Sequence, residues 1–110
     1  MIKINIGITG CLGRMGQQLI KSILSDKQIK LIALTESRII KKKIFGITPE
    51  LNNEKAFKNA DVIIDFSIPK CTFEVLEIAR KLKKKVVIGT TGFTKKEEDQ
   101  IKKFSKKIPI

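Results

Sequence analysis

Apolar residues fall into four short blocks along the chain. Residues 2–9 alternate isoleucine with other residues, and residues 29–36, 61–67 and 84–91 hold short apolar runs, rich in valine and isoleucine, that few polar residues interrupt. Such runs are typical of parallel strands that are buried on both faces of a sheet. The pattern therefore predicts four strands at these positions.

Helical periodicity occupies most of the sequence between these blocks. Two segments place apolar residues on one helix face: Met15, Leu19, Ile20, Ile23 and Leu24 in the first, and Val75, Leu76, Ala79 and Leu82 in the second. Thr94 followed by Glu97 has the capping-box pattern of a helix start, ahead of Ile101, Phe104 and Ile108. For residues 37–60 we expect a basic loop, a turn at Pro49 and a short helix over 55–59.

Strands that alternate with helices predict βαβ units and a right-handed crossover between parallel strands. The expected fold is α/β, a Rossmann-like doubly wound parallel sheet. No internal repeat or linker divides the 110 residues, so one domain is expected over 1–110. The final residues, KIPI, resemble the beginning of a fifth strand, and we expect the chain to stop partway through its fold.

The formal net charge of +12 leaves nucleic-acid binding open as an interpretation. The lysines are scattered, however, without interleaved aromatic residues and without a zinc or helix-turn-helix signature. A solvated basic surface is the preferred interpretation, and its positive field would also attract an anionic ligand.

Cysteine and histidine content argues against metal or disulfide chemistry. The chain has no histidine, and Cys11 and Cys71 lack metal-ligand spacing. We expect no metal site. The sequence also contains neither a signal peptide nor a run of about 20 apolar residues that could span a membrane, so a cytoplasmic location is expected.

The stretch GITGCLGRMGQQLI joins the first predicted strand to the first predicted helix, and its glycines are three residues apart. A glycine turn at this place in an α/β fold predicts dinucleotide binding. Gly10 would permit a sharp turn, Gly13 close approach of the pyrophosphate, and Gly16 close packing of the helix. The amides of Arg14, Met15 and Gly16 would face the phosphates. The spacing GxxGxxG is less specific than GxGxxG, and a turn kept only for packing is the alternative.

Three further strand ends are expected at the same edge of the sheet. Glu36 ends the second predicted strand, 20 residues after Gly16, where a carboxylate commonly accepts hydrogen bonds from the adenosine ribose. The stretches DFSIP and GTTGF bring small and hydroxyl-bearing residues there. Asp65 is expected to be a structural hydrogen-bond acceptor rather than a catalytic acid. We expect Cys11 to present only its backbone, and Cys71 to be a small residue at a helix start.

The segments GITGCLGRMGQQLI, DFSIPKCTFEVL and VVIGTTGF, in this order and spacing, resemble the dihydrodipicolinate reductases over essentially the whole chain. The resemblance implies an enzyme that uses NADH or NADPH to reduce 4-hydroxy-tetrahydrodipicolinate in lysine and diaminopimelate biosynthesis. It assigns the phosphate loop to the glycine turn, the ribose to Glu36, and the nicotinamide side to Phe66 and residues 89–91. The implied cofactor-binding residues are Gly10, Cys11, Leu12, Gly13, Arg14, Met15, Gly16, Glu36, Ser37, Arg38, Phe66, Gly89, Thr90 and Thr91.

Two features depart from that family's pattern. Many members carry an arginine directly after the carboxylate to receive the 2′-phosphate of NADPH. Here Ser37 holds that position and Arg38 follows it, which favours NADH. The family's His-His-x-x-Lys motif and its homotetramer contacts lie in a following domain. We therefore expect only the cofactor-binding portion, with no catalytic residue and no turnover of its own.

Other classes of protein share parts of these motifs. The stretch TGCLGRMG also fits extended short-chain dehydrogenases, but their Tyr-x-x-x-Lys pair is excluded because the chain has no tyrosine. CoA-binding domains of the acyl-CoA-ligase type also use a GxxGxxG turn. A CoA-binding domain and a basic nucleic-acid-binding domain both remain alternatives.

Overall fold

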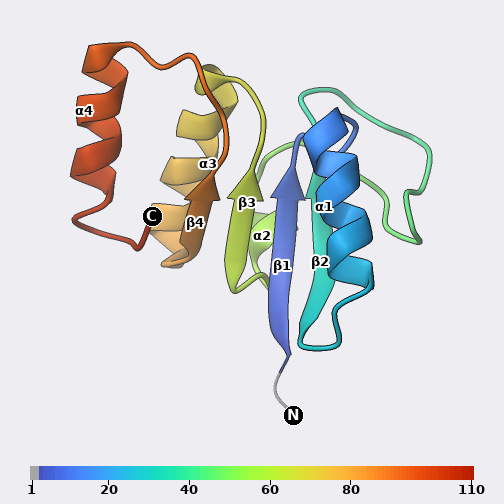
Figure 1. Cartoon of the computed structure of the whole chain (residues 1–110). Helices are drawn as coiled ribbons and strands as arrows, with labels where there is room; N and C mark the ends of the chain where they lie inside the picture. The colour runs from blue at the N-terminus through green and yellow to red at the C-terminus, as the bar shows by residue number, and fades with distance from the viewer. Residues whose placement is uncertain (1–2) are drawn as a thin grey trace.

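All four predicted strands are present, and helices connect them in the predicted order (Figure 1). The computed structural model describes residues 3–110, so the start of the strand predicted over 2–9 lies outside the described residues. The elements are β1 (Ile4–Thr9), α1 (Arg14–Leu24), β2 (Ile29–Thr35), α2 (Glu54–Phe57), β3 (Val62–Asp65), α3 (Pro69–Leu82), β4 (Lys85–Ile88) and α4 (Lys95–Phe104).

The strands form one parallel sheet in the order β2-β1-β3-β4. The chain moves outward from β1 to β2, then returns to the other side of β1 for β3 and β4. Thr9 and Asp65 are paired at the carboxyl ends of the two central strands. This is the topological switch point at which open α/β sheets bind ligands.

Apolar side chains form a core on each face of the sheet. One core lies under α1 and includes Ile6, Ile8, Ile20, Ile23, Leu31 and Leu34. The other lies under α2 and α3 and includes Phe57, Ile63, Val75, Leu76, Ala79 and Val86. Figure 1 shows α1 in front of the sheet and α2 and α3 behind it. The predicted α/β, doubly wound architecture is confirmed.

The buried face of α1 is narrower than the periodicity predicts. Ile20 and Ile23 are buried, but Met15 and Leu24 are each 52% exposed. These two residues lie in the first and last turns of the helix. The side chain of Met15 is therefore available at the carboxyl edge of the sheet.

The expected turn at Pro49 is wrong. The chain reverses instead at Phe45 and Gly46, which both have positive φ, and the amides of Ile44 and Ile47 each donate to the other's carbonyl. Two positive φ angles in a two-residue loop are typical of a type I′ hairpin turn. Pro49 is a buried residue in the extended segment that follows.

That extended segment adds to the outer edge of β2. The amide of Glu50 donates to the carbonyl of Leu34 at 3.0 Å, and the carbonyl of Glu50 accepts from the amide of Glu36 at 2.9 Å. The expected loop therefore contains a short stretch of sheet pairing. The short helix predicted over 55–59 is present as α2, capped by the side chain of Asn53.

The last helix begins as predicted, with Thr94 and Glu97 forming a complete capping box. It packs beside α3, where the ring of Phe73 lies 6.5 Å from that of Phe104. After the helix, the carbonyl of Pro109 accepts a hydrogen bond from the amide of Val86 at 3.0 Å. That bond lies at the edge of β4 where the fifth strand was expected, although residues 109–110 are not assigned to a strand.

We predict that Phe57→Ala lowers the free energy of unfolding by about 3–5 kcal/mol. Its ring is fully buried in the core under α2 and α3 and lies next to Gly7 in the centre of the sheet. Truncation removes apolar contact and leaves a cavity. Urea unfolding followed by circular dichroism measures the change.

The control for this measurement is Ile39→Ala. Its side chain is 73% exposed, so the expected change is within about 0.5 kcal/mol. A loss below about 1 kcal/mol in Phe57→Ala would contradict the placement of α2 against the sheet.

Candidate functional site

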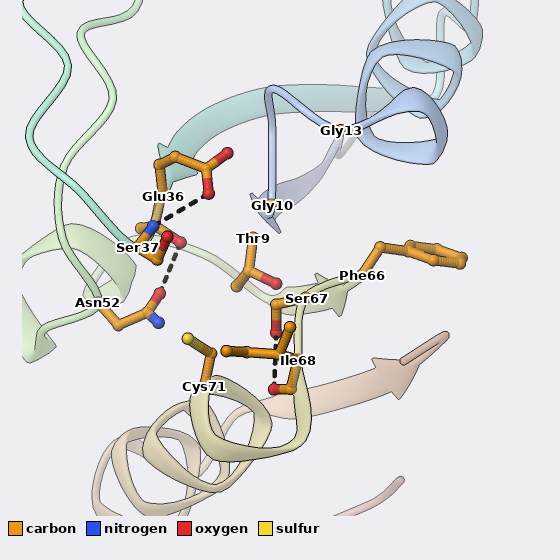
Figure 2. Close-up of a pocket in the computed structure, with 11 residues that line it drawn as sticks. Thr9, Gly10, Gly13, Glu36, Ser37, Asn52, Phe66, Ser67, Ile68 and Cys71 are labelled. Carbon is orange, nitrogen blue, oxygen red and sulfur yellow. Dashed lines mark hydrogen bonds between the residues drawn. The ribbon is translucent and has the colours of Figure 1, made fainter. Parts of the chain in front are cut away.

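Two clefts open at the carboxyl ends of β1 and β3, one on each side of the turn that follows β1. The first has a volume of about 210 Å³ and is lined by Thr9, Gly10, Gly13, Thr35, Glu36, Ser37, Asn52, Phe66, Ser67, Ile68 and Cys71 (Figure 2). The second has a volume of about 420 Å³ and is lined by Gly13, Arg14, Met15, Gly16, Phe66, Ser67, Gly89, Thr90 and Thr91. Gly13, Phe66 and Ser67 line both clefts.

Steric contacts explain the glycines of the turn between β1 and α1. Gly10 has φ +67, and a Cβ there would lie 2.0 Å from the carbonyl oxygen of Phe66. A Cβ at Gly16 would lie 2.3 Å from the carbonyl oxygen of Gly10. The sharp turn and the close helix packing predicted from the sequence are therefore confirmed, and both glycines have a packing role whether or not a ligand is bound.

The first amides of this turn are already hydrogen bonded. Those of Gly10 and Cys11 donate to the carbonyl of Thr35, at 3.0 and 3.3 Å. The amide of Leu12 donates to the carboxylate of Glu36 at 3.0 Å. These contacts hold the turn against the end of β2 and leave those amides unavailable to a ligand.

The amide of Gly13 donates to the carbonyl of Gly10 at 3.0 Å, and the three amides after it are free. No acceptor within residues 3–110 is found for the backbone N–H groups of Arg14, Met15 and Gly16, whereas the amide of Gln17 donates to the carbonyl of Gly13 at 3.0 Å. The first turn of α1 contains no acidic residue. Unpaired amides at a helix N-terminus favour an anion. Since these three residues line the second cleft, the site can hold a phosphate group there.

Glu36 lies directly after β2 at the rim of the first cleft. Its two carboxylate oxygens accept from the amides of Leu12 and Ser37, each at 3.0 Å. Figure 2 shows Glu36 and Ser37 together on one side of the cleft. An ionised carboxylate has about four acceptor positions, so this one can still accept hydrogen bonds from ligand hydroxyl groups.

Asp65, at the end of β3, is completely buried. Its carboxylate accepts hydrogen bonds from the hydroxyl groups of Thr9, Ser67, Thr72 and Thr90. It forms no ion pair with any lysine or arginine in the described part of the chain. The prediction that Asp65 is a structural hydrogen-bond acceptor is confirmed.

The segments after β3 and β4 are packed together. A Cβ at Gly89 would lie 2.0 Å from the ring of Phe66, so only glycine lets that ring lie against the end of β4. The amide of Ser67 donates to the hydroxyl of Thr90 at 2.8 Å. Together these residues form the wall of the second cleft opposite the glycine turn.

Most of the cofactor-binding residues expected from the sequence are brought together in the two clefts. Those that line them are Gly10, Gly13, Arg14, Met15, Gly16, Glu36, Ser37, Phe66, Gly89, Thr90 and Thr91. Cys11, Leu12 and Arg38 line neither cleft. Cys11 is fully buried in the core under α1, and Arg38 is exposed. Burial, and then the nearby Glu36 carboxylate, raise the pKa of the Cys11 thiol to about 11.

Several lining residues were not expected from the sequence. Thr9 and Thr35 end their strands, so the rule that ligands bind at strand ends could have indicated them. No sequence pattern indicates Asn52, because it lies in the segment between β2 and α2, which has little hydrophobic periodicity. It is held at the first cleft by the hydroxyl of Thr35, which donates to its side-chain oxygen at 2.6 Å. Cys71 is buried beneath the first cleft, and burial followed by the charge of Glu74 raises the pKa of its thiol.

The described residues contain neither a helix that could span a membrane nor a group of side chains that could bind a metal ion. Within residues 3–110, no helix is long and apolar enough to cross a bilayer. Histidine, cysteine and acidic side chains in that range do not gather in threes where they could hold a metal ion.

The fold and the clefts define a class of protein. A parallel sheet with its switch point beside a glycine turn, free amides at the following helix, and a carboxylate after the second strand together form a Rossmann-type nucleotide-binding domain. Comparison with known proteins gives the family. Residues 4–110 match the family model described as dihydrodipicolinate reductase, N-terminus. The chain belongs to that family.

Curated relatives named 4-hydroxy-tetrahydrodipicolinate reductase align with almost the whole of this chain. It is 64% identical over 110 residues to the 4-hydroxy-tetrahydrodipicolinate reductase of Pelagibacter ubique (strain HTCC1062), covering 100% of this chain and 43% of that protein. Identity to the enzyme of the same name from Buchnera aphidicola subsp. Acyrthosiphon pisum (strain Tuc7) is 45%, covering 98% of this chain and 44% of the relative. The chain therefore spans less than half the length of these relatives.

Solved structures share the fold. A dipicolinate-bound dihydrodipicolinate reductase from Paenisporosarcina sp. TG-14 superposes with a TM-score of 0.75 at 23% identity, covering 94% of this chain and 43% of that one. The NADP-bound pyrroline carboxylate reductase of Plasmodium falciparum superposes with a TM-score of 0.62 at 20% identity, covering 99% and 39%. At these identities the likeness concerns the fold.

We predict that Asp65→Asn lowers the free energy of unfolding by about 1–3 kcal/mol. The new amide group would be a donor facing hydroxyl groups that now donate to Asp65, so at least one buried hydroxyl would lose its acceptor. Thermal and urea unfolding measure the loss.

The same change at Asp99 is the control, because its carboxylate is exposed in an ion pair with Lys95. Surface ion pairs contribute little, and the expected change is below about 1 kcal/mol. Equal stability of Asp65→Asn and the wild-type chain would show that the buried carboxylate is not the acceptor on which these strand ends depend.

Proposed function

We propose that this chain is the NAD(P)H-binding part of a 4-hydroxy-tetrahydrodipicolinate reductase. One observation carries the proposal: free amides and a carboxylate stand on opposite sides of a single glycine turn. The first group suits the anionic pyrophosphate, and the second suits ribose hydroxyl groups. Two clefts that share this turn match the two nucleotide halves of the cofactor.

Each half of the cofactor has a place in this proposal. The adenosine half lies in the first cleft, with its ribose on Glu36. The pyrophosphate lies on the amides of Arg14, Met15 and Gly16. The nicotinamide half lies in the second cleft beside Phe66 and residues 89–91. The same-fold pyrroline carboxylate reductase, which holds NADP, supports a nicotinamide dinucleotide as the ligand.

The residues around the ribose favour NADH over NADPH. Glu36 would face a 2′-phosphate with a like charge, which disfavours that ligand. Ser37 lines the first cleft without a positive charge, and Arg38 is exposed and lines neither cleft. A preference for NADH follows from this arrangement.

In the longer relatives, the domain would hold the reduced nicotinamide so that its hydride passes to 4-hydroxy-tetrahydrodipicolinate, a step of lysine and diaminopimelate biosynthesis. The cofactor supplies the hydride, and the domain supplies binding and orientation. We assign the catalytic residues and the homotetramer contacts to the part of the relatives that this chain does not cover. The chain by itself would then bind cofactor without turnover, in the cytoplasm.

Calorimetric titration of the folded chain with NADH, NADPH and CoA in moderate salt tests the proposed ligand. We expect saturable binding of NADH, binding of NADPH about tenfold weaker, and no saturable binding of CoA. CoA carries a phosphate on the ribose 3′-oxygen, so it lacks the free pair of ribose hydroxyl groups and would bring a like charge beside Glu36. Tighter binding of CoA than of NADH would establish the CoA-binding alternative. A parallel titration with a DNA duplex tests the other alternative, which binding of the duplex without binding of NADH would establish.

Replacement of Glu36 tests the ribose assignment. We expect Glu36→Ala to weaken NADH binding roughly 10- to 100-fold, the loss of hydrogen bonds to a charged acceptor. Because Glu36 also holds the amide of Leu12, Glu36→Gln is the sharper variant: its amide oxygen can keep that bond while the charge is removed.

We expect Glu36→Gln to give an intermediate loss, at a thermal midpoint close to that of the wild-type chain. Glu98→Ala, an exposed change on α4, is the control and should leave the affinity unchanged. NADH affinity within threefold of wild type in Glu36→Ala would show that the carboxylate does not contact the ribose.

A further inference from the structure

The four hydroxyl groups around Asp65 are all oriented by the same acceptor. A hydroxyl group has one proton to donate and lone pairs with which it accepts. The hydroxyl of Ser67 lies 2.6 Å from Oδ1 of Asp65 and that of Thr90 lies 2.9 Å from Oδ2, while Thr9 and Thr72 make shorter contacts with Oδ1 and Oδ2. Each of the four protons is therefore committed to the carboxylate.

Competing acceptors do not change this assignment for Ser67. Its hydroxyl also lies 3.4 Å from the carbonyl oxygen of Ile68, the contact drawn in Figure 2. The Asp65 contact is shorter and has a charged acceptor, and bonds of that kind are the stronger ones. With its proton held by Asp65, the oxygen of Ser67 can interact with a further group only as an acceptor.

Ser67 lies where its hydroxyl oxygen can accept a hydrogen bond from a ligand. It lines both clefts, and Figure 2 shows it between Thr9 and Ile68, with Glu36 on one side and Phe66 on the other. Its amide is held by Thr90, whose hydroxyl in turn donates to Asp65. Both ends of the residue are thus fixed through the same buried carboxylate. Thr72 differs, because it is fully buried and lines neither cleft.

We propose that Asp65 is a positioning residue that fixes the Ser67 hydroxyl as a hydrogen-bond acceptor at the junction of the two clefts. The site there takes a donor group of the bound dinucleotide, a ribose hydroxyl or an amide N–H. The phosphate oxygens are held by the amides of the glycine turn. This inference rests on the proposed function, because it assumes that a dinucleotide occupies both clefts.

The test compares NADH binding by calorimetry in four chains of 110 residues. We expect Ser67→Ala to weaken binding about three- to tenfold, as for the loss of one hydrogen bond between neutral groups. Ser67→Thr keeps the hydroxyl and should restore the affinity to within twofold. Thr72→Val removes another hydroxyl from the same carboxylate without facing a cleft, so it should lower the thermal midpoint and leave the affinity within twofold of wild type.

Two further comparisons assign the donor and the role of Asp65. ADP-ribose lacks the nicotinamide, so an equal loss for NADH and ADP-ribose in Ser67→Ala identifies a ribose hydroxyl, and a loss for NADH alone identifies the amide. If Asp65 fixes the Ser67 hydroxyl as an acceptor, the two residues act together. Adding Ser67→Ala to the Asp65→Asn chain should then lower its NADH affinity by no more than twofold, because the two changes are coupled.

Three results would overturn the inference: wild-type affinity in Ser67→Ala, equal losses in Ser67→Ala and Thr72→Val, or no recovery in Ser67→Thr. In these cases the wild-type chain still binds NADH and the proposed function stands. A folded wild-type chain that binds neither NADH nor NADPH contradicts the proposed function, and the assignment of Ser67 to a dinucleotide donor falls with it.

Discussion

The buried carboxylate of Asp65 is the interaction on which the architecture of the site depends. Burial of a charge costs several kcal/mol unless hydrogen bonds replace its hydration. Here the four donors come from β1, the segment after β3, α3 and the segment after β4. All of these elements meet at the carboxyl edge of the sheet. A carboxylate that must be satisfied by all of them fixes the relative positions of the strand ends and thereby the floor of both clefts.

A second carboxylate, that of Glu36, lies at the rim of the first cleft, whereas Asp65 is buried below it. Glu36 is half-buried, and it fixes the glycine turn through the amide of Leu12. The earlier amides of the turn are held by Thr35, Glu36 and the carbonyl of Gly10, so only the amides at the start of α1 are left for an anion. Hydrogen-bond donors therefore lie along the glycine turn, and hydrogen-bond acceptors lie at the strand ends. A dinucleotide, which combines an anionic centre with hydroxyl-bearing sugars on both sides, needs this separation.

Local physical chemistry explains why much of this was predictable from the sequence. Short runs of valine and isoleucine between helical segments predict buried parallel strands, and the capping box at Thr94 is complete within four residues. The glycine turn was predictable because a Cβ at Gly10 would overlap backbone atoms. The reversal in the segment between β2 and α2 also has a local signal, because Gly46 supplies the positive φ that the turn needs, whereas no turn forms at Pro49. The fold class, the order of strands and helices along the chain, the glycine turn and the position of Glu36 at the end of β2 all follow from such short-range constraints.

The remaining features depend on residues that are far apart in the sequence. Asn52 reaches the first cleft only because its segment pairs with the outer edge of β2. Cys11, in the turn before α1, is in the core, whereas Met15, in the first turn of α1, is exposed, and both depend on how this segment packs against the sheet. The four hydroxyl groups that surround Asp65 belong to threonine and serine residues that form no sequence motif. Thr9 and Thr90 come close to Asp65 through the register of β1, β3 and β4. The sequence by itself determined which elements form and where the glycine turn and the carboxylate of Glu36 lie along the chain, because those properties depend on near neighbours. Only the tertiary structure decided which side chains share the Asp65 carboxylate as an acceptor, because packing between elements far apart in the sequence sets those distances.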